Sequence, residues 1–166
     1  MEGKMDKDRE RFARWFSGVL QYLESPDHAQ DAGAILLMAS FPLLERYLRN
    51  KCRQREDVIE LPAGFHVELT KVFPTLGGEG EAKEFWKRWR HGLMHRVMLN
   101  DEKDRWEVKD GAAIVEGDSK KGFRVNPVKF SRHVRETIAS DLATFMAGKH
   151  LGVDPYGGTG TRMGSY

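Results

Sequence analysis

The run from Glu81 to Leu99, EAKEFWKRWRHGLMHRVML, constrains the fold more than any other stretch of the chain. Wound as a helix at about 100° per residue, it gathers its large apolar side chains within a wedge of roughly 120°. These side chains are Phe85, Trp86, Trp89, Leu93 and Val97. An apolar stripe of this size has to be buried against other elements. We therefore predict a central helix with Trp89 in the middle of the core.

The opposite side of this helix carries cations and imidazoles. Its residues are Lys87, Arg88, His91 and His95, with Arg90 at the flank. A face of this kind is ordinarily just a solvated surface. It can also be a site, because neutral imidazole abstracts protons near pH 7 and arginine holds a phosphate through two parallel hydrogen bonds. One Arg and two His would suffice for phosphodiester chemistry without a metal, so both interpretations stay open.

A zinc site is not indicated, although His91 and His95 have the i, i+4 spacing of a zinc-binding helix. A metalloprotease helix would carry Glu directly after the first His, where this chain has Gly92. No third ligand is evident nearby, and two imidazoles make a poor site. We expect no metal and no cofactor.

The rest of the chain is predicted to be mainly helical. Its length of 166 residues suits one domain with a sizeable core. Pro42 is expected either to kink the second helix or to restart it, with Ser40 as the new cap. The helices expected besides the central one are Asp8–Leu23, about His28–Arg55, the short Phe65–Val72, and Pro127–Met146.

Three of these helices have apolar side chains at spacings of three and four residues, which predicts a buried stripe on each. The stripes comprise Phe12, Trp15, Phe16, Val19, Leu20 and Leu23 in the first helix; Ile35, Leu36, Met38, Ala39, Leu43, Leu44, Tyr47 and Leu48 in the second; and Phe130, Val134, Ile138, Leu142 and Phe145 in the last.

Short strands are predicted between the central helix and the last one, at Trp106–Val108, Ala112–Val115 and Phe123–Val125. Asp110-Gly111 and Gly117-Asp118 are turn signals between them. The predicted fold is an all-α bundle of four main helices, with a short extra helix and a small β-hairpin or three-stranded insert before the last long helix. Residues 1–151 form one domain in this prediction, and 152–166 form a flexible Gly-rich tail.

The cysteine count, the N-terminal residues and the apolar runs indicate the cellular compartment that we expect. Cys52 is the only cysteine, so no intrachain disulfide forms. The charged N-terminus does not resemble a signal peptide. The longest apolar run, Ala32–Leu44, is shorter than the ~18 residues that a membrane span requires. We expect a cytoplasmic protein with no membrane contact.

The net charge of +2 does not by itself indicate a nucleic-acid partner, but basic residues cluster. If packing joined the clusters, their surface would attract a polyanion. Within the central helix, Lys87, Arg88 and Arg96 are the candidate substrate-binding residues. The clusters are Arg46, Arg49, Lys51, Arg53 and Arg55; Lys83, Lys87, Arg88, Arg90 and Arg96; and Lys120, Lys121 and Arg124.

Glu45 lies among apolar neighbours in the second helix, and two interpretations apply. The carboxylate can form a surface pair with Arg49 at i+4, which contributes a few tenths of a kcal/mol. It can instead support the central helix by holding Arg90 or a histidine in place. The first is slightly favoured from the residues alone.

The spacing Arg90-His91-Gly92-Leu93-Met94-His95 resembles the Arg-x(4–6)-His signature of HEPN domains (higher eukaryotes and prokaryotes nucleotide-binding). The run from Leu43 to Arg49, LLERYLR, also resembles the second helix of some bacterial HEPN-like families. The resemblance covers residues 27–148, and its specific residues are Glu45 and the stretch 90–95.

This resemblance implies a metal-independent endoribonuclease, acting as a toxin or in antiviral defence, with an antitoxin or another protein as a further partner. RNA would be its substrate, His95 the general base or acid, Arg90 the stabiliser of phosphate charge, and His91 an orienting or RNA-binding residue. A non-catalytic HEPN-like module that binds a protein or nucleotide is the alternative, and a ligand-free helical scaffold is a third.

The resemblance also implies a homodimer with a composite site. The geometry of an ideal helix points the same way, since Arg90 and His95 lie about 140° apart around its axis. We therefore expect Arg90 of one chain to act with His95 of the other.

Overall fold

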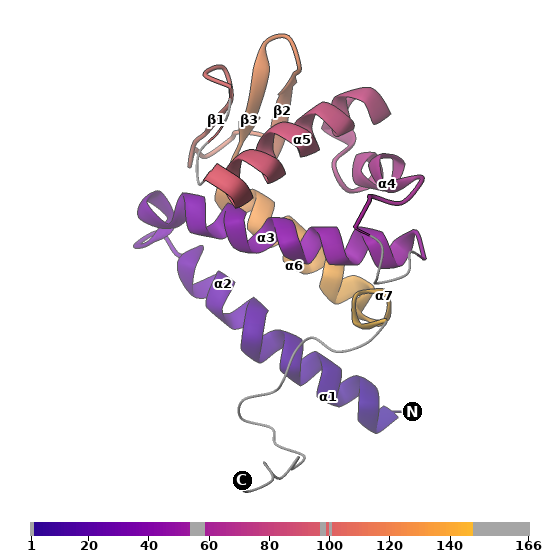
Figure 1. The fold of residues 1–166 in the computed structure, drawn as a ribbon. Coiled ribbons are helices and arrows are strands. Elements are labelled where there is room, and N and C mark those ends of the chain that lie inside the picture. The colour runs from indigo at the N-terminus through magenta and orange to yellow at the C-terminus, as the bar shows by residue number, and fades with distance from the viewer. Residues whose placement is uncertain (1, 54–58, 97–98, 100, 148–166) are drawn as a thin grey trace, which may run out of the picture.

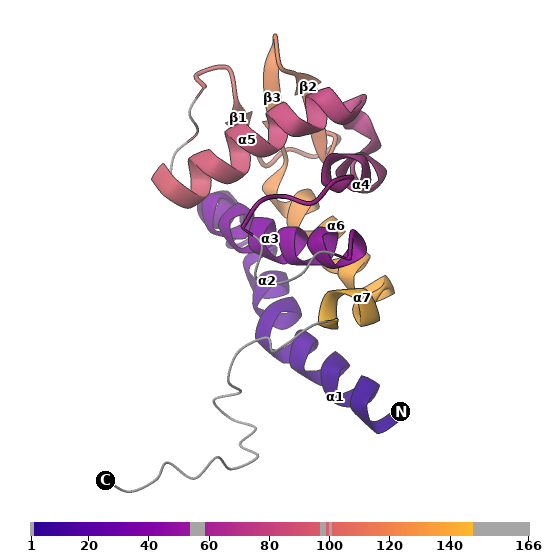
Figure 2. The same cartoon turned by 45° about the vertical axis from the view of Figure 1, so that its right-hand side comes forward.

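The chain is mainly helical and carries one small three-stranded sheet (Figures 1 and 2). The structure is a computed structural model that describes residues 2–53, 59–96, 99 and 101–147. The tail expected over 152–166, its boundary with the domain, and the predicted helix end at Arg55 lie outside these residues. Within the described part, none of the helices is long and apolar enough to cross a membrane.

The first helical run contains a π-helical turn that the sequence did not reveal. α1 (Glu2–Phe12) continues through the π turn η1 (Ala13–Ser17) into α2 (Gly18–Leu23). A π turn takes up one extra residue, which rotates all later side chains around the helix axis. The prediction for Val19 is therefore wrong: it leaves the stripe and is 55% exposed, while Phe12 and Leu20 are buried.

α3 (Ala29–Lys51) is one helix that runs through Pro42, so no second helix starts there. Pro42 lies on its exposed side. Seven of the eight predicted core residues of this helix are buried or partly buried. Ile35 is the exception, at 56% exposed, because the adjacent Leu36 and Leu37 already face the core.

α5 (Glu79–Arg96) buries the predicted wedge. Trp89 and Phe85 are fully buried, Trp86 and Leu93 nearly so, and Val97 lies outside the described residues. α4 (Phe65–Val72) and the 3-10 turn η2 (Pro74–Leu76) precede α5. The Phe41 ring of α3 packs against Phe85 and Trp86 at centroid distances of 6.0 and 5.5 Å, which joins α3 and α5 through one aromatic core.

The insert is a sheet of strand order β1-β3-β2, formed by β1 (Arg105–Trp106), β2 (Val115–Asp118) and β3 (Gly122–Val125). β2 and β3 pair antiparallel as a hairpin, and β1 pairs parallel with β3. Gly117-Asp118 lies inside β2 and not in a turn. Gly33 of α3 allows the sheet to approach, because a Cβ there would stand 2.3 Å from the Trp106 ring.

The last predicted helix is interrupted. α6 (Pro127–Ser140) ends at Asp141, whose φ of −137° and ψ of 51° are not helical, and α7 (Leu142–Met146) follows. The predicted core stripe from Phe130 to Phe145 is buried. In both views α5 and the sheet lie on one side of α3, and α1 and α2 lie on the other (Figures 1 and 2). α3 is therefore the central element of the fold. Arg90, at the edge of the basic face of α5, contacts it through Glu45.

Candidate functional site

Glu45 of α3 joins the two helices that carry the predicted site. Its Oε2 accepts a 2.8 Å hydrogen bond from Nε of Arg90 on α5. Its Oε1 accepts a 3.0 Å bond from Nε of Arg49, one turn along α3. The two interpretations of Glu45 are therefore both realised, since one carboxylate contacts both guanidinium groups. Its side chain is only 14% exposed, which strengthens these charged contacts relative to a pair in water.

Arg90 also reaches His95 of the same chain. Its Nη1 lies 3.3 Å from Nε2 of the imidazole. The separation of about 140° expected for an ideal helix therefore does not keep the two side chains apart, because that angle describes only the positions of the Cα atoms. An arginine side chain is long and has several rotatable bonds, so it spans an angle that the backbone leaves open. The geometric reason for a site shared between two chains is thereby removed.

His91 completes the group. The rings of His91 and His95 lie with their centroids 4.4 Å apart at an interplanar angle of 45°. Both residues are exposed, whereas Arg90 is partly buried. We call Glu45, Arg90, His91 and His95 the Arg90 cluster. It places one guanidinium and two imidazoles at a single partly exposed position of one chain.

Arg49 connects this cluster to the segment that follows α3. Its Nη2 donates to the carbonyl of Ile59 at 2.8 Å, and its Nη1 donates to the carbonyl of Glu60 at 2.9 Å. Arg49 is thereby used in holding the backbone, and Glu45 is held in place by Arg49. The orientation of Arg90 on α5 thus depends on Glu45 and Arg49 of α3, and through Arg49 on the backbone at Ile59 and Glu60.

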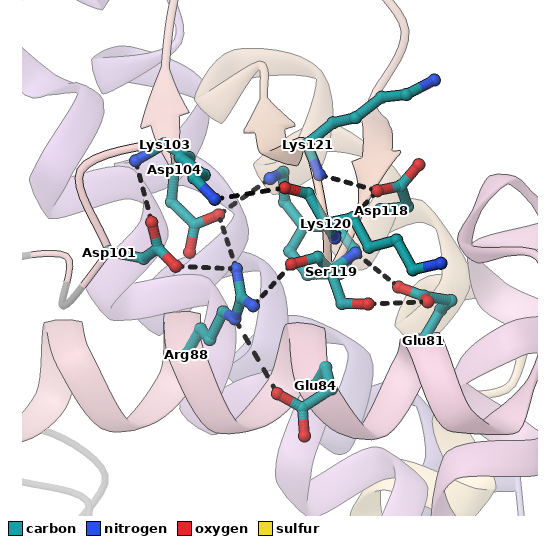
Figure 3. Close-up of polar contacts among 11 residues, drawn as sticks. Glu81, Glu84, Arg88, Asp101, Lys103, Asp104, Asp118, Ser119, Lys120 and Lys121 are labelled. Carbon is teal, nitrogen blue, oxygen red and sulfur yellow. Dashed lines mark hydrogen bonds and ion pairs between the residues drawn. The ribbon is translucent and has the colours of Figure 1, made fainter.

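Arg88, predicted to bind substrate, serves another purpose. Its side chain is 18% exposed and forms ion pairs with Asp101 at 3.1 Å and Asp104 at 3.5 Å (Figure 3). Nη2 donates to the Ser119 carbonyl at 2.7 Å, and the guanidinium lies 5.7 Å from the centroid of the Phe123 ring. Arg88 therefore anchors the sheet to α5, and the prediction of substrate binding is not retained for it.

Two acidic residues of this junction escaped the sequence reasoning. The fully buried Asp104 carboxylate accepts the Phe123 N–H at 2.8 Å, and Glu81 accepts the N–H and the hydroxyl of Ser119 at 2.7 and 2.9 Å (Figure 3). Burial raises the pKa of Asp104, while the Phe123 N–H and Arg88 oppose that rise. The only available signal was that Glu81 and Arg88, seven residues apart, share a face of α5.

The other predicted basic residues divide between surface and structure. Lys87 and Arg96 are exposed on α5, Lys87 one turn before His91 and Arg96 directly after His95. At the end of α3, by contrast, Arg46 donates to the Phe145 and Ala147 carbonyls and Lys51 pairs with Asp141. Arg46 and Lys51 therefore hold α7, and they do not extend a surface around the Arg90 cluster.

Metal ligands do not gather at the cluster. Within the described residues, no group of three or more His, Cys, Asp or Glu side chains is arranged to hold a metal ion. His91 and His95 are joined there by Arg90, whose guanidinium repels a cation. The arrangement can bind an anion and exchange a proton with it.

Comparisons of the chain with protein-family models, with curated proteins and with solved structures found no match.

Proposed function

We propose that the chain is a metal-independent endoribonuclease whose active site is the Arg90 cluster. The contact between Arg90 and His95 within one chain carries the proposal. It sets a phosphate-binding cation beside a group that can accept a proton, and a second imidazole lies against the first. The resemblance of residues 90–95 to the HEPN signature supports the same chemistry.

The reaction would use the ribose 2′-hydroxyl as nucleophile. His95 would take the proton of that hydroxyl, O2′ would attack the adjacent phosphorus, and the bond from phosphorus to O5′ would break. The products are a 2′,3′-cyclic phosphate and a 5′-hydroxyl, and the leaving O5′ takes its proton from solvent water. Arg90 would neutralise the charge that develops on the non-bridging phosphate oxygens.

The remaining residues of the site would bind and orient. His91 lies against the His95 ring and would orient it or contact the RNA. Glu45 would keep the Arg90 guanidinium in place. Lys87 and Arg96, both exposed on α5, would meet neighbouring phosphates.

The resemblance also implies a homodimer and a role as a toxin or defence effector, with an antitoxin or similar protein as partner. In our proposal the dimer presents two Arg90 clusters, each formed within one chain. This differs from a composite site in a way that can be measured, as discussed below.

Cleavage of a labelled single-stranded RNA in EDTA tests the proposal. We expect cleavage with 2′,3′-cyclic phosphate ends, and we expect His95→Ala to abolish it while circular dichroism stays unchanged. His28→Ala is the matched control, since His28 lies between α2 and α3 and packs on Tyr22. Absence of cleavage by pure wild-type protein would instead favour the non-catalytic module. Activity that EDTA removes and zinc restores would overturn the metal-independent mechanism.

A further inference from the structure

The contact between Arg90 and His95 has a chemical consequence for the imidazole. A guanidinium has five N–H donors and no acceptor. The 3.3 Å contact between Nη1 of Arg90 and Nε2 of His95 can therefore be a hydrogen bond only if Nε2 accepts. An accepting Nε2 carries no proton. The ring is then neutral and bears its proton on Nδ1.

The Arg90 guanidinium is held in place by Glu45. Its Nε is bound to Oε2 of Glu45 at 2.8 Å, and Oε1 of that carboxylate is occupied by Arg49. A carboxylate held at both oxygens has little freedom to turn. Glu45 thus aims the remaining N–H groups of Arg90 along α5 toward His95.

We infer that Glu45 is a positioning residue that, through Arg90, keeps His95 in its Nδ1–H tautomer and occupies Nε2 until an anion draws the guanidinium away. This inference deepens the proposed function, and the catalytic role that it gives to the tautomer rests on that function. The anion is a phosphodiester of RNA, because its two non-bridging oxygens match the paired N–H groups of a guanidinium.

The arrangement gives the site a resting state. While Arg90 contacts Nε2, the lone pair that would take the 2′-hydroxyl proton is occupied. When a phosphate takes the Arg90 donors, Nε2 is no longer held as an acceptor and the ring can exchange tautomers, so whichever nitrogen is unprotonated can serve as the base beside the bound phosphate. Within the described residues, the contacts of the His95 ring are with Arg90 at Nε2 and with the ring of His91.

Long-range proton–nitrogen NMR of uniformly 15N-labelled protein tests the inference directly, because protonated and unprotonated ring nitrogens resonate far apart. The spectrum of His95→Gln assigns the His95 signals among the six histidines. At a pH where the ring is neutral, we expect wild-type His95 to be mainly in the Nδ1–H form. Arg90→Met should move most of the population to the Nε2–H form that free imidazole prefers, and Glu45→Gln should move part of it.

Arg96→Met is the matched control, since Arg96 is the neighbouring exposed arginine of the same helix, and it should leave the tautomer unchanged. Inorganic phosphate added to wild type should shift His95 toward the Nε2–H form, whereas sodium chloride at equal ionic strength should not. That arm requires no substitution, so a variant that fails to fold does not remove the test.

Wild-type His95 in the Nε2–H form, or a tautomer unaffected by Arg90→Met, overturns the inference. An absent response to phosphate overturns the release of Nε2. These results are independent of RNA cleavage, which is assayed separately. The expected His95 tautomers without RNA cleavage would contradict the proposed function but not the inference about the tautomer. RNA cleavage without these tautomers would contradict the inference but not the proposed function.

Discussion

At the scale of single residues, Glu45 and Asp104 show two uses of a carboxylate that is largely removed from water. Glu45 shares its oxygens between two arginines of which one also contacts a histidine. Asp104 is fully buried and shares Arg88 with Asp101. The first arrangement leaves a guanidinium and two imidazoles accessible. The second encloses its cation, so it stabilises the fold and offers little to a ligand.

Trp89 provides the test of the core at this scale. It is fully buried in α5 and packs on Phe85 at a centroid distance of 5.9 Å. Trp89→Ala should lower the free energy of unfolding by about 3–5 kcal/mol through the cavity that it leaves. Urea unfolding followed by circular dichroism measures this. Trp89→Phe should cost clearly less, since the indole N–H has no hydrogen-bond partner in the described structure. An unchanged midpoint for Trp89→Ala would contradict the position of α5.

At the scale of elements, the chain is held together by side chains that reach from one element to the backbone of another. Arg88 and Glu81 of α5 bind the backbone of the β2–β3 turn at Ser119. Arg46 and Asn50 of α3 bind the last carbonyls of α7. Such contacts satisfy backbone groups that a short strand or helix leaves unpaired, which is how elements of two to five residues persist here.

The junction between α5 and the sheet gives the second stability prediction. Arg88→Gln leaves the buried Asp104 carboxylate without its cation, and it should lower the free energy of unfolding by about 3 kcal/mol. Lys87→Gln, an exposed neighbour on the same helix, should change it by less than about 0.5 kcal/mol. Chemical denaturation of the two variants makes the comparison. Equal effects would show that the Arg88 contacts contribute nothing net.

The break between α6 and α7 predicts a pH dependence. Asp141 accepts hydrogen bonds from Lys51, Tyr47 and Thr144. The Lys51 contact is the main cause that lowers the pKa of Asp141 in the folded chain. A carboxyl with a lowered folded pKa stabilises the fold above its unfolded pKa, and that contribution is lost as pH falls through the folded value.

Wild type should therefore have a higher free energy of unfolding than Asp141→Asn at neutral pH. This difference should shrink as the pH falls below the ordinary pKa of aspartate and through the lowered pKa of Asp141. Thermal unfolding of both proteins across this range measures it. A difference that stays constant with pH would show that the charge of Asp141 is unimportant. Glu136→Gln, an exposed carboxylate of α6, is the control.

At the scale of the whole molecule, α3 determines which side chains meet. It lies between α5 with the sheet on one side and α1 with α2 on the other (Figures 1 and 2). Glu45 lies on its α5 side, whereas Tyr47, Lys51 and Asn50 contact the α6–α7 region. A single chain therefore assembles the Arg90 cluster without a second copy.

Mixing two inactive variants tests this. If each active site forms within one chain, Arg90→Ala and His95→Ala refolded together should stay inactive, because no chain carries both groups. A composite site would instead recover part of the activity in the mixed dimers. Size-exclusion chromatography of differently tagged chains establishes that mixed dimers form. Recovery of activity would restore the shared-site model that the resemblance implies.

Periodicity alone was enough to predict the main helices and most of the buried stripes, because an apolar face at spacings of three and four has only one way to leave water. Phe85, Trp86, Trp89 and Leu93 are buried for that reason. Val19 was mispredicted because a π turn changes the helical period, and no residue type marks that turn.

For the candidate site, too, the sequence predicted one part and the tertiary structure decided the other. The sequence alone placed Arg90, His91 and His95 on one helix and identified Glu45 as a carboxylate with two possible partners. Only the tertiary structure decided that Glu45 contacts both Arg49 and Arg90, that Arg90 reaches His95 within one chain, and that Arg88 is enclosed by Asp101 and Asp104. The reason is that helical period is a property of neighbouring residues, whereas the direction of a long charged side chain depends on which opposite charges distant segments bring within its reach.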